Sequence, residues 1–357
     1  MKVLHLVEAT ATGTLSMVSL LANKQAAEGL KVVVIYSVRN ETPKEIKSYF
    51  SSSVELIIVD MSSLKGKLLS FSRVRSEVKK IHPRIIFLHS SFAGFVGRVS
   101  LIFSGLSAFV YYIPHCISFM RKDVGVLKKT MFVFLEMFAA MKKSAFIACS
   151  ESERKAIQAA IPFRQCFLAE NAVDAPGLAS VITPRNLHVV TVGGIREQKG
   201  PAAFAEIARL VSVRRPDIRF VWIGDGDSAL KKLLKEANVL VAGWMDRNSV
   251  YKELATSSLY LSSAQWEGMP VSVIEAMYTR TPVVASRCAG NVDVVTNGET
   301  GWLYNDLADA ADLIVYCIEN EVELERVSSC AYDVALSRFS PDRYYQTICS
   351  IIEQHPS

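Results

Sequence analysis

The sequence lacks the patterns that would assign it to several common classes of protein. Its seven cysteines are scattered singly with no C-x-x-C pair, which argues against a disulfide framework or a zinc site and favours reduced thiols in a cytosolic protein. It has no apolar run of about 18 residues, so we expect no membrane-spanning helix. The N-terminal MKVLHLVEAT has too short an apolar run for a signal peptide and is typical of a first strand.

A large excess of charge of one sign is also absent. The 40 Lys and Arg residues against 35 Asp and Glu leave a formal net charge of +5. This excess is too small to indicate a nucleic-acid partner, but it suits anionic lipid or a phosphorylated ligand. Hydrophobic residues make up 50% of the chain and charged residues 21%, which excludes wholesale disorder. The 357 residues predict about two domains.

Short β-branched runs alternate with stretches of helical length along the whole chain. Because these runs lack strict apolar–polar alternation, they predict strands buried on both faces of parallel sheets. Expected strands are 2–7, 31–37, 54–60, 84–89, 108–113 and 145–149, then 187–192, 218–224, 239–243, 258–263 and 282–286. In the first half, expected helices are 14–28, 66–81, 92–103, 126–142 and 151–160. The fold class is therefore α/β, with two doubly wound Rossmann-like domains in tandem and a ligand cleft between them.

The pattern pauses at 171–186, which is rich in Ala, Pro, Gly and Ser and is the expected linker. We predict an N-terminal domain over 1–175, a C-terminal domain over 183–338, and a last helix over 340–357 that crosses back to the first domain. In the second domain, helical spacing predicts two core-facing helix stripes. One is Phe204, Ile207, Ala208 and Val211, and the other is Leu230, Leu233, Leu234 and Ala237.

The most informative segment is SSAQWEGMPVSVIEAMYTRTPVVAS, at 262–286. It places Glu267 in a loop before a helix that begins near Pro270, with Glu275 inside that helix. The free N–H groups and dipole of a helix N-terminus form an anion site suited to a diphosphate. Carboxylates beside such a site can accept hydrogen bonds from sugar hydroxyls. Two glutamates at this spacing are common on their own.

The motif E-G-M-P-x-S-x-x-E-A-M followed by P-V-V-A-S resembles the signature of glycosyltransferase family 4, the retaining transferases of GT-B fold that use nucleotide sugars. The resemblance spans nearly the whole chain. Further matching segments in the second half are VGGIREQKG, FVWIGDGD, AGWMDR and GNVDVVTNGETGWL. In the first half they are EATATGT, LHSSFAG, IPHCISF, CSESE and NAVD.

The resemblance implies roles for residues of the second domain. Glu267 would contact donor-sugar hydroxyls, Glu275 would bind the ribose, and Lys199 would neutralise the leaving diphosphate. A fixed cation at that place stabilises developing charge without a metal. The backbone around Gly268, Met269, Pro270 (through its neighbours) and Val271 would approach the diphosphate. The backbone at Met245 would contact the base.

One departure from the family pattern concerns the phosphate-binding arginine. The family usually has Gly-Arg at a position where this chain has Gly193-Gly194. Arg196 can reach the same phosphate, because alternate residues of an extended segment point the same way. The alternative is that Arg196 is simply solvated.

The first domain carries the remaining implied site residues. The first loop, which is glycine-rich in the family, has few glycines here. Gly13 is the residue expected to allow close approach of the backbone to the diphosphate. His115 matches the active-site histidine of the family, with a histidine satisfied inside a buried loop as the alternative. His89 and Ser90, at another strand end, are expected to line the acceptor pocket, whereas His5 inside the first strand is expected to be structural.

Two other motifs suggest different chemistry and are set aside. Asp225-Gly226-Asp227 spells the D-x-D metal motif of the other large glycosyltransferase fold. Since it follows a strand of the second domain, we interpret it as a strand-to-helix turn and expect neither a metal nor any other cofactor. No G-x-G-x-x-G opens a helix after the first strand, which excludes a dinucleotide dehydrogenase.

The segment KKTMFVFLEMFAAMKK, at 128–143, is apolar between two lysine pairs. We expect a buried helix of the first domain, with an interfacial helix on anionic headgroups as the alternative. The interfacial alternative would make the protein peripheral on the cytoplasmic face of the inner membrane.

The resemblance implies a metal-independent, retaining transfer from a nucleotide-diphosphate sugar, with UDP as the expected nucleotide, to a hydroxyl of a glycan. Lipid-linked acceptors in bacterial surface polysaccharide assembly are common in the family. The alternatives are an epimerase or phosphorylase on the same fold, or a non-catalytic sugar-nucleotide-binding partner. A phosphorylase would need a pyridoxal-phosphate lysine or a dedicated phosphate site, and neither has a clear marker in the sequence.

Overall fold

The computed structural model describes residues 1–175 and 185–354, which form two compact units. Unit 1 is Met1–Asn171 together with the chain from Tyr344 onward, and unit 2 is Ala172–Arg343. The boundary falls within the expected linker at 171–186, of which residues 176–184 lie outside the described part. Among the described helices, none is both long enough and apolar enough to cross a bilayer.

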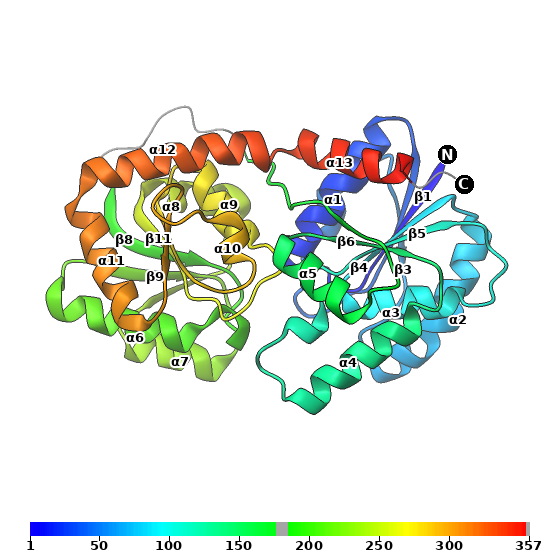
Figure 1. Ribbon diagram of the computed structural model, residues 1–357, viewed down its shortest axis with the longest axis horizontal. Helices are drawn as coiled ribbons and strands as arrows, with labels where there is room; N and C mark the ends of the chain where they lie inside the picture. Colours follow the sequence, from blue (N-terminus) through cyan, green and yellow to red (C-terminus); the bar gives the residue numbers. More distant parts are fainter. Residues whose placement is uncertain (176–184, 355–357) are drawn as a thin grey trace. The chain divides into compact units, whose positions relative to one another are not determined.

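Unit 1 is built on a parallel seven-stranded sheet in the order β3-β2-β1-β4-β5-β6-β7 (Figure 1). Its strands are β1 (Lys2–Val7), β2 (Lys31–Tyr36), β3 (Glu55–Ile58), β4 (Ile85–His89), β5 (Phe109–Ile113), β6 (Ala145–Ala148) and β7 (Cys166–Leu168). Its helices are α1 (Thr12–Ala27), α2 (Leu64–Ile81), α3 (Ser91–Leu101), α4 (Val126–Ala139), α5 (Glu151–Ala160) and, from Tyr344 on, α13 (Pro341–Glu353), with short turns η1 (Ile46–Tyr49) and η2 (Ser118–Met120).

Unit 2 has a parallel six-stranded sheet in the order β10-β9-β8-β11-β12-β13. The strands are β8 (Asn186–Val192), β9 (Arg219–Ile223), β10 (Leu240–Gly243), β11 (Ser257–Ser262), β12 (Val283–Ser286) and β13 (Trp302–Tyr304). The helices are η3 (Glu197–Lys199), α6 (Pro201–Arg214), α7 (Ser228–Glu236), α8 (Arg247–Thr256), α9 (Val271–Tyr278), α10 (Asn291–Val294), α11 (Leu307–Glu319) and α12 (Glu321–Arg338).

Burial on both faces explains the continuous apolar strands. All five residues of β4 are buried, and in unit 1 one hydrophobic cluster lies under α2 and α3 while another lies under α1. In unit 2, the predicted stripe of Phe204, Ile207, Ala208 and Val211 is fully buried on α6. Leu234 and Ala237 are buried as well, and Leu230 and Leu233 pack against the same core. The two core-facing stripes and the parallel sheets are confirmed.

The strand order fixes where a ligand can bind in each unit. In both sheets the order reverses direction at the two central strands, β1 and β4 in unit 1 and β8 and β11 in unit 2. Ligands of open α/β sheets bind outside the carboxyl ends of strands at such a switch point. The loops that follow Val7, His89, Val192 and Ser262 are therefore the places to search for a site.

Candidate active site

Lys199 and Glu267 form an ion pair at the switch point of unit 2. Lys199 ends η3 after β8, and Glu267 lies in the loop between β11 and α9, so the two loops meet where the strand order reverses. The Lys199 Nζ lies 2.7 Å from Glu267 Oε1, and the Gln198 amide donates a hydrogen bond of 3.2 Å to Glu267 Oε2. The two charged side chains are 18% and 9% exposed. The pair is thus held in place yet still reachable from solvent.

The environment keeps Lys199 cationic. Burial is the largest single effect and opposes the charge of its ammonium. The attraction and hydrogen bond of Glu267, together with a contribution from Tyr260, outweigh it, so the pKa of Lys199 is raised above its usual value. A permanent positive charge at this switch point is suited to hold a diphosphate leaving group.

Glu275 is buried inside α9, one turn beyond the helix start that follows the N-cap residue Pro270. Burial raises the pKa of Glu275, while the Arg247 guanidinium, with Nη2 3.6 Å from Glu275 Oε1, opposes that shift. The Lys199 charge and the Tyr251 hydroxyl oppose it as well. A carboxylate has about four acceptor sites, so Glu275 can also accept hydrogen bonds from vicinal hydroxyls. The α9 N-terminus and Glu275 lie on the same short helix that the Glu267 loop leads into.

Arg196 lies close to Gly194, where the family has its arginine. It is exposed, and its Nε lies 3.8 Å from the position that a Cβ at Gly194 would take. A side chain at 194 would point into the space beside this guanidinium, so Arg196 approaches the region that the family arginine would occupy. Its exposure also fits the alternative of a solvated side chain, so contact of Arg196 with the phosphate stays a prediction.

Glycine is required where the loops of unit 2 touch. Gly290 has φ +87°, and a Cβ added there would lie 2.6 Å from Glu267 Cβ. Gly200 has φ +66°, and a Cβ there would lie 2.0 Å from the Ser263 carbonyl oxygen. These contacts press the 263–267 loop against its two neighbours and fix the position of the Glu267 carboxylate.

Replacing Gly290 by alanine should therefore displace Glu267. We expect Gly290→Ala to weaken nucleotide-sugar binding by about tenfold, because the loop must shift in addition to the backbone strain of about 1–3 kcal/mol. Gly298→Ala is the matched control: its φ is +76°, but among the described residues, its two chain neighbours apart, no atom lies within 4 Å of the added Cβ. Calorimetric titration with the donor measures both variants, and equal affinities would show that the contact with Glu267 is irrelevant.

The other predicted residues of unit 2 divide into enclosed and open positions. Gly268, Met269 and Pro270 are buried in the loop before α9, Val271 is half-buried at the start of the helix, and Met245 is 37% exposed after β10.

The D-x-D motif forms a turn, as expected. Asp227 caps α7 by accepting hydrogen bonds from the amides of Ala229 and Leu230, and Asp225 Oδ1 lies 2.7 Å from Lys231 Nζ.

Unit 1 contains a chain of three histidines that ends at His115. The Gln25 Oε1 lies 2.7 Å from His5 Nε2, His5 Nδ1 lies 3.0 Å from His89 Nε2, and His89 Nδ1 lies 3.1 Å from His115 Nε2. The rings of His5 and His89, and of His89 and His115, are stacked. Among the described residues, His115 Nδ1 is a buried atom without a hydrogen-bond partner.

The chain has one consistent set of proton positions. A carbonyl oxygen only accepts, so His5 Nε2 carries the proton facing Gln25, and each neutral ring then accepts at Nδ1 from the Nε2–H of the next. Burial lowers the pKa of His5 and of His115 to about 4 and holds that of His89 well below its usual value, so all three rings are neutral near pH 7. His115 Nδ1 is left as an acceptor, which suits a hydroxyl donor.

His89 lies between the other two histidines. It is fully buried, and both of its ring nitrogens are engaged by the other two histidines, so it supports His115 from behind. Direct contact of His89 with an acceptor stays a prediction that this position does not favour. Ser90 has φ +73° and a buried hydroxyl without a hydrogen-bond partner in the described part of the chain, and Gly13 is half-buried at the start of α1.

Removing the Gln25 acceptor should allow His115 to adopt both neutral tautomers. In Gln25→Leu we expect mixed Nδ1–H and Nε2–H forms of His115 and a kcat about three- to tenfold lower, the size of one hydrogen bond. The ¹⁵N–¹H correlation spectrum of the imidazoles reports the tautomers directly. Ser19→Ala, which removes another buried polar group from α1, should leave the spectrum unchanged. An Nδ1–H His115 in the wild type would contradict the assigned direction.

The same burial predicts an acid-sensitive stability for unit 1. The unfolded chain binds protons at His5 and His115 near pH 6.5, whereas the folded rings resist until about pH 4. The unfolding free energy should therefore be highest above pH 6.5 and should fall as the pH decreases from 6.5 to 4. When the unfolding free energy is measured with denaturant at several pH values in this range, its slope against pH should be shallower for His5→Gln than for the wild type. Identical slopes would exclude neutral folded histidines.

A loop held by Glu153 positions His115. His115 and Cys116 have φ +56° and +99°, conformations that non-glycine residues adopt only when their surroundings impose them. Glu153 of α5 is fully buried and accepts hydrogen bonds of 2.8 Å from the amides of Cys116 and Ile117 at Oε1, and from Cys149 N at Oε2. Burial raises the pKa of Glu153, and these hydrogen bonds counter that shift.

Comparison with known proteins assigns this chain to a family. A sequence profile of glycosyl transferases group 1 matches residues 186–320. The chain is 30% identical over 300 residues to the UDP-Gal:alpha-D-GlcNAc-diphosphoundecaprenol alpha-1,3-galactosyltransferase of Escherichia coli, covering 74% of this chain and 72% of that protein. The chain belongs to the glycosyl transferases group 1 family. It is also 26% identical over 319 residues to an uncharacterized 41.2 kDa protein of the Klebsiella pneumoniae cps region, covering 85% and 86% of the two chains.

Solved structures give the fold of this group 1 glycosyltransferase. Sucrose-phosphate synthase from Thermosynechococcus elongatus superposes with a TM-score of 0.84 at 16% identity over 99% of both chains. Anabaena HepE in complex with UDP and glucose gives 0.80 at 18% identity over 99% of this chain and 100% of that one. The predicted GT-B fold is confirmed, and the chain is a glycosyltransferase that takes its sugar from a nucleotide-sugar donor.

Several residues of this group 1 glycosyltransferase that hold the site were not predicted from sequence. Gln25, Gln198 and Arg247 meet their partners across loops or strands that lie far apart in sequence. Glu153 did carry a local signal, since Ser150-x-x-Glu153 has the form of a capping box. The Ser150 side chain accepts from Glu153 N as that motif requires, but the Glu153 carboxylate reaches the Cys116 loop as well.

Proposed function

We propose that this protein is a retaining, metal-independent transferase of glycosyltransferase family 4. It moves a sugar from a UDP-sugar to a hydroxyl of a lipid-linked glycan in the assembly of a bacterial surface polysaccharide, such as O-antigen, capsule or exopolysaccharide. The observation that carries the proposal is the Lys199–Glu267 pair, 2.7 Å apart at the switch point of unit 2 and beside the short helix that bears Glu275.

Each charged group has a task in the proposed reaction. Glu267 accepts hydrogen bonds from donor-sugar hydroxyls and Glu275 from ribose hydroxyls. Lys199 and the α9 dipole stabilise the charge that develops on the departing diphosphate, with Arg196 on the same phosphates. The diphosphate leaves from the face that the acceptor hydroxyl attacks, so the anomeric configuration is retained. His115, through its unprotonated Nδ1, accepts a hydrogen bond from a sugar hydroxyl.

The relatives supply the first donor and acceptor to test. The Escherichia coli relative is named for UDP-galactose as donor and for an N-acetylglucosaminyl diphosphoundecaprenol as acceptor, and HepE is solved with UDP-glucose. A lipid-diphosphate acceptor would bring the protein to the cytoplasmic face of a membrane as a peripheral protein. The seven free cysteines suit that reducing compartment.

The experiment is a panel of UDP-sugars assayed by thermal shift and by UDP release, in chelator, for the wild type and Glu275→Ala. We expect one donor to stabilise the wild type and to be turned over without added metal. The variant should lose both effects, because the ribose loses its carboxylate. A requirement for a divalent cation, or equal behaviour of the variant, would overturn the assignment of this site.

An acceptor titration separates transfer from the alternatives. A transferase consumes the donor only when a hydroxyl acceptor is present, and the product keeps the anomeric configuration of the donor. An epimerase converts the donor alone, a phosphorylase requires inorganic phosphate, and a non-catalytic partner binds the donor without consuming it. N-acetylglucosaminyl diphosphate carried on a short polyprenyl chain is the first acceptor to use.

A further inference from the structure

Helix α4 is packed with its apolar side chains outward. The sequence led us to expect a buried helix over 126–142, and the structure corrects this expectation: α4 lies on the outside of unit 1 next to α3 (Figure 1). An exposed apolar row runs along it at helical spacing, continued by one residue beyond its end. Its members, here called the apolar stripe, are Leu127, Met131, Phe134, Phe138 and Met141, exposed by 87%, 47%, 68%, 44% and 61%.

The side of α4 that faces the unit is polar at its centre. Glu136 is 3% exposed and pairs with Arg98 of α3, with Nη2 2.5 Å from Oε2. The Tyr112 hydroxyl donates to Glu136 Oε1 at 3.1 Å, and the Arg98 guanidinium lies 4.1 Å from the centre of the Tyr112 ring. A helix of a water-soluble protein normally shows the reverse pattern, with charge outward and large apolar groups inward. The outer side of α4 is therefore built for an apolar partner.

The charges around the stripe indicate which apolar partner. The segment 121–143 carries six lysines and arginines but only two acidic residues. One of these, Glu136, is buried against Arg98, and the other, Asp123, is paired with Arg121. Within the residues that the structure describes, Lys142 and Lys143 form no ion pair with a carboxylate. Cations at both ends of an exposed apolar helix match the anionic headgroups and acyl chains of a bilayer surface.

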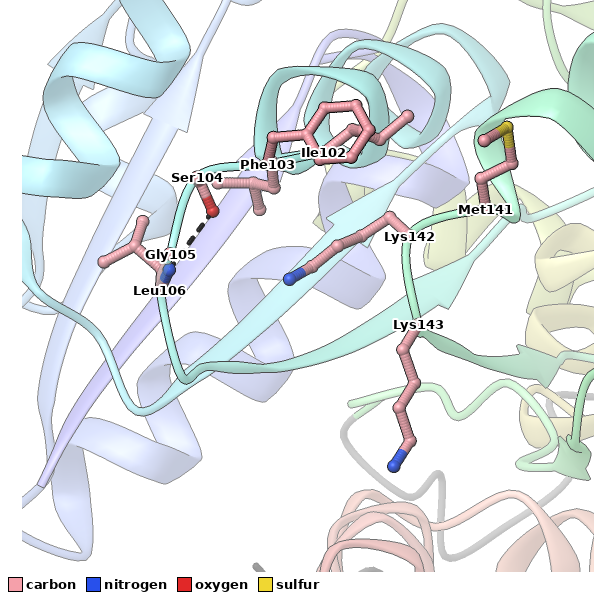
Figure 2. Close-up of a pocket in the computed structure, with 9 residues that line it drawn as sticks. Ile102, Phe103, Ser104, Gly105, Leu106, Met141, Lys142 and Lys143 are labelled. Carbon is pink, nitrogen blue, oxygen red and sulfur yellow. Dashed lines mark hydrogen bonds between the residues drawn. The ribbon is translucent and has the colours of Figure 1, made fainter.

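A shallow pocket of about 310 Å³ lies at the C-terminal end of the stripe. Residues 101–106 and 141–143 line it, and Figure 2 shows the Lys142 side chain extending toward the turn of Ser104 and Leu106, whereas Lys143 points away. Phe103 at its rim is 89% exposed. A cation beside an exposed aromatic ring and apolar walls suits a lipid headgroup above its acyl chains.

We infer that α4, together with the 101–106 turn, is the surface by which this protein binds an anionic lipid bilayer, with the apolar stripe inserted and the flanking lysines on headgroups. The helix lies in the plane of the interface and is held to unit 1 by the Arg98–Glu136 pair. The inference rests on the proposed function only for its purpose, which is to bring the enzyme to a lipid-borne acceptor. The surface itself is independent of the donor site.

Vesicle flotation without donor or acceptor tests the surface directly. The probes are vesicles of phosphatidylglycerol mixed with phosphatidylcholine and vesicles of phosphatidylcholine alone. We expect the wild type to bind the mixed vesicles, and a Leu127→Ser, Phe134→Ser, Phe138→Ser variant to bind at least about tenfold more weakly. Lys142→Glu with Lys143→Glu should remove the preference for anionic lipid. The matched control is Val213→Ser with Val322→Ser, because these residues are 86% and 87% exposed on α6 and α12 of unit 2.

Each result has one meaning. Binding by the triple serine variant equal to that of the wild type, or no binding by the wild type, would overturn the inference. A wild type that forms dimers in light scattering, with the dimer lost in the triple variant and no vesicle binding, would make the stripe an interface between two copies and overturn it as well. Thermal shift by the UDP-sugar in unit 2 is measured alongside, so failure of the donor site is seen separately.

Discussion

Replacing Lys199 by alanine is expected to lower kcat about 10²–10³-fold, with a much smaller change in KM. The leaving diphosphate gains charge only as the bond to the sugar breaks, so a cation at this place acts mainly on the transition state. Its ammonium lies 2.7 Å from Glu267 and has a raised pKa, so it stays charged throughout the working pH range. UDP release under saturating donor and acceptor measures the effect.

Two variants show whether the charge acts on the donor or only on Glu267. Lys231→Ala removes a lysine from the same unit that is paired with Asp225, and it should leave kcat unchanged. Glu267→Gln keeps the shape of the side chain but removes the partner charge of Lys199. If the loss in Lys199→Ala arose only from a misplaced Glu267, the double variant would be no slower than Glu267→Gln alone. A further loss in the double variant supports direct contact of Lys199 with the diphosphate.

The sequence was sufficient for the sheets and for the loop that carries Glu267. Continuous apolar strands such as β4 are long enough to show their burial in the sequence, and the stripe from Phe204 to Val211 shows helical spacing. The strands β7 and β13 were missed because each has three residues at a sheet edge, too few for a periodicity. The first strand has the expected boundaries, and those of the other predicted strands differ by at most two residues.

Long-range polar contacts could not be predicted in the same way. The sequence of α4 indicates burial because most of its residues are apolar, and only the partner of Glu136 shows which side faces inward. That partner, Arg98, lies 38 positions away on another helix. His5 was expected to be structural, and it is buried; what the sequence did not show is that its contact with His89, 84 positions away, makes it part of the support of His115. Such pairs depend on strand order and register, which one sequence does not reveal.

Replacing Glu153 by alanine is expected to lower the unfolding free energy of unit 1 by about 3 kcal/mol or more. The change leaves the buried amides of Ile117 and Cys149 and the part-buried amide of Cys116 without their acceptor, and each loss at a buried amide costs about 1–3 kcal/mol. At about 2–4 °C per kcal/mol for a unit of this size, the melting temperature should fall by roughly 10 °C. Differential scanning calorimetry measures the shift.

The control for Glu153 lies two residues away on the same helix. Glu151 is paired with Arg154 at the surface, so Glu151→Ala should change the unfolding free energy by no more than about 1 kcal/mol. Glu153→Gln separates charge from shape, because its single carbonyl oxygen can hold the Cys116 loop or Cys149 but not both. We therefore expect Glu153→Gln to retain more stability than Glu153→Ala while losing kcat, since the positive φ of His115 and Cys116 is no longer imposed. Full activity in Glu153→Gln would show that the loop keeps His115 in place without the carboxylate.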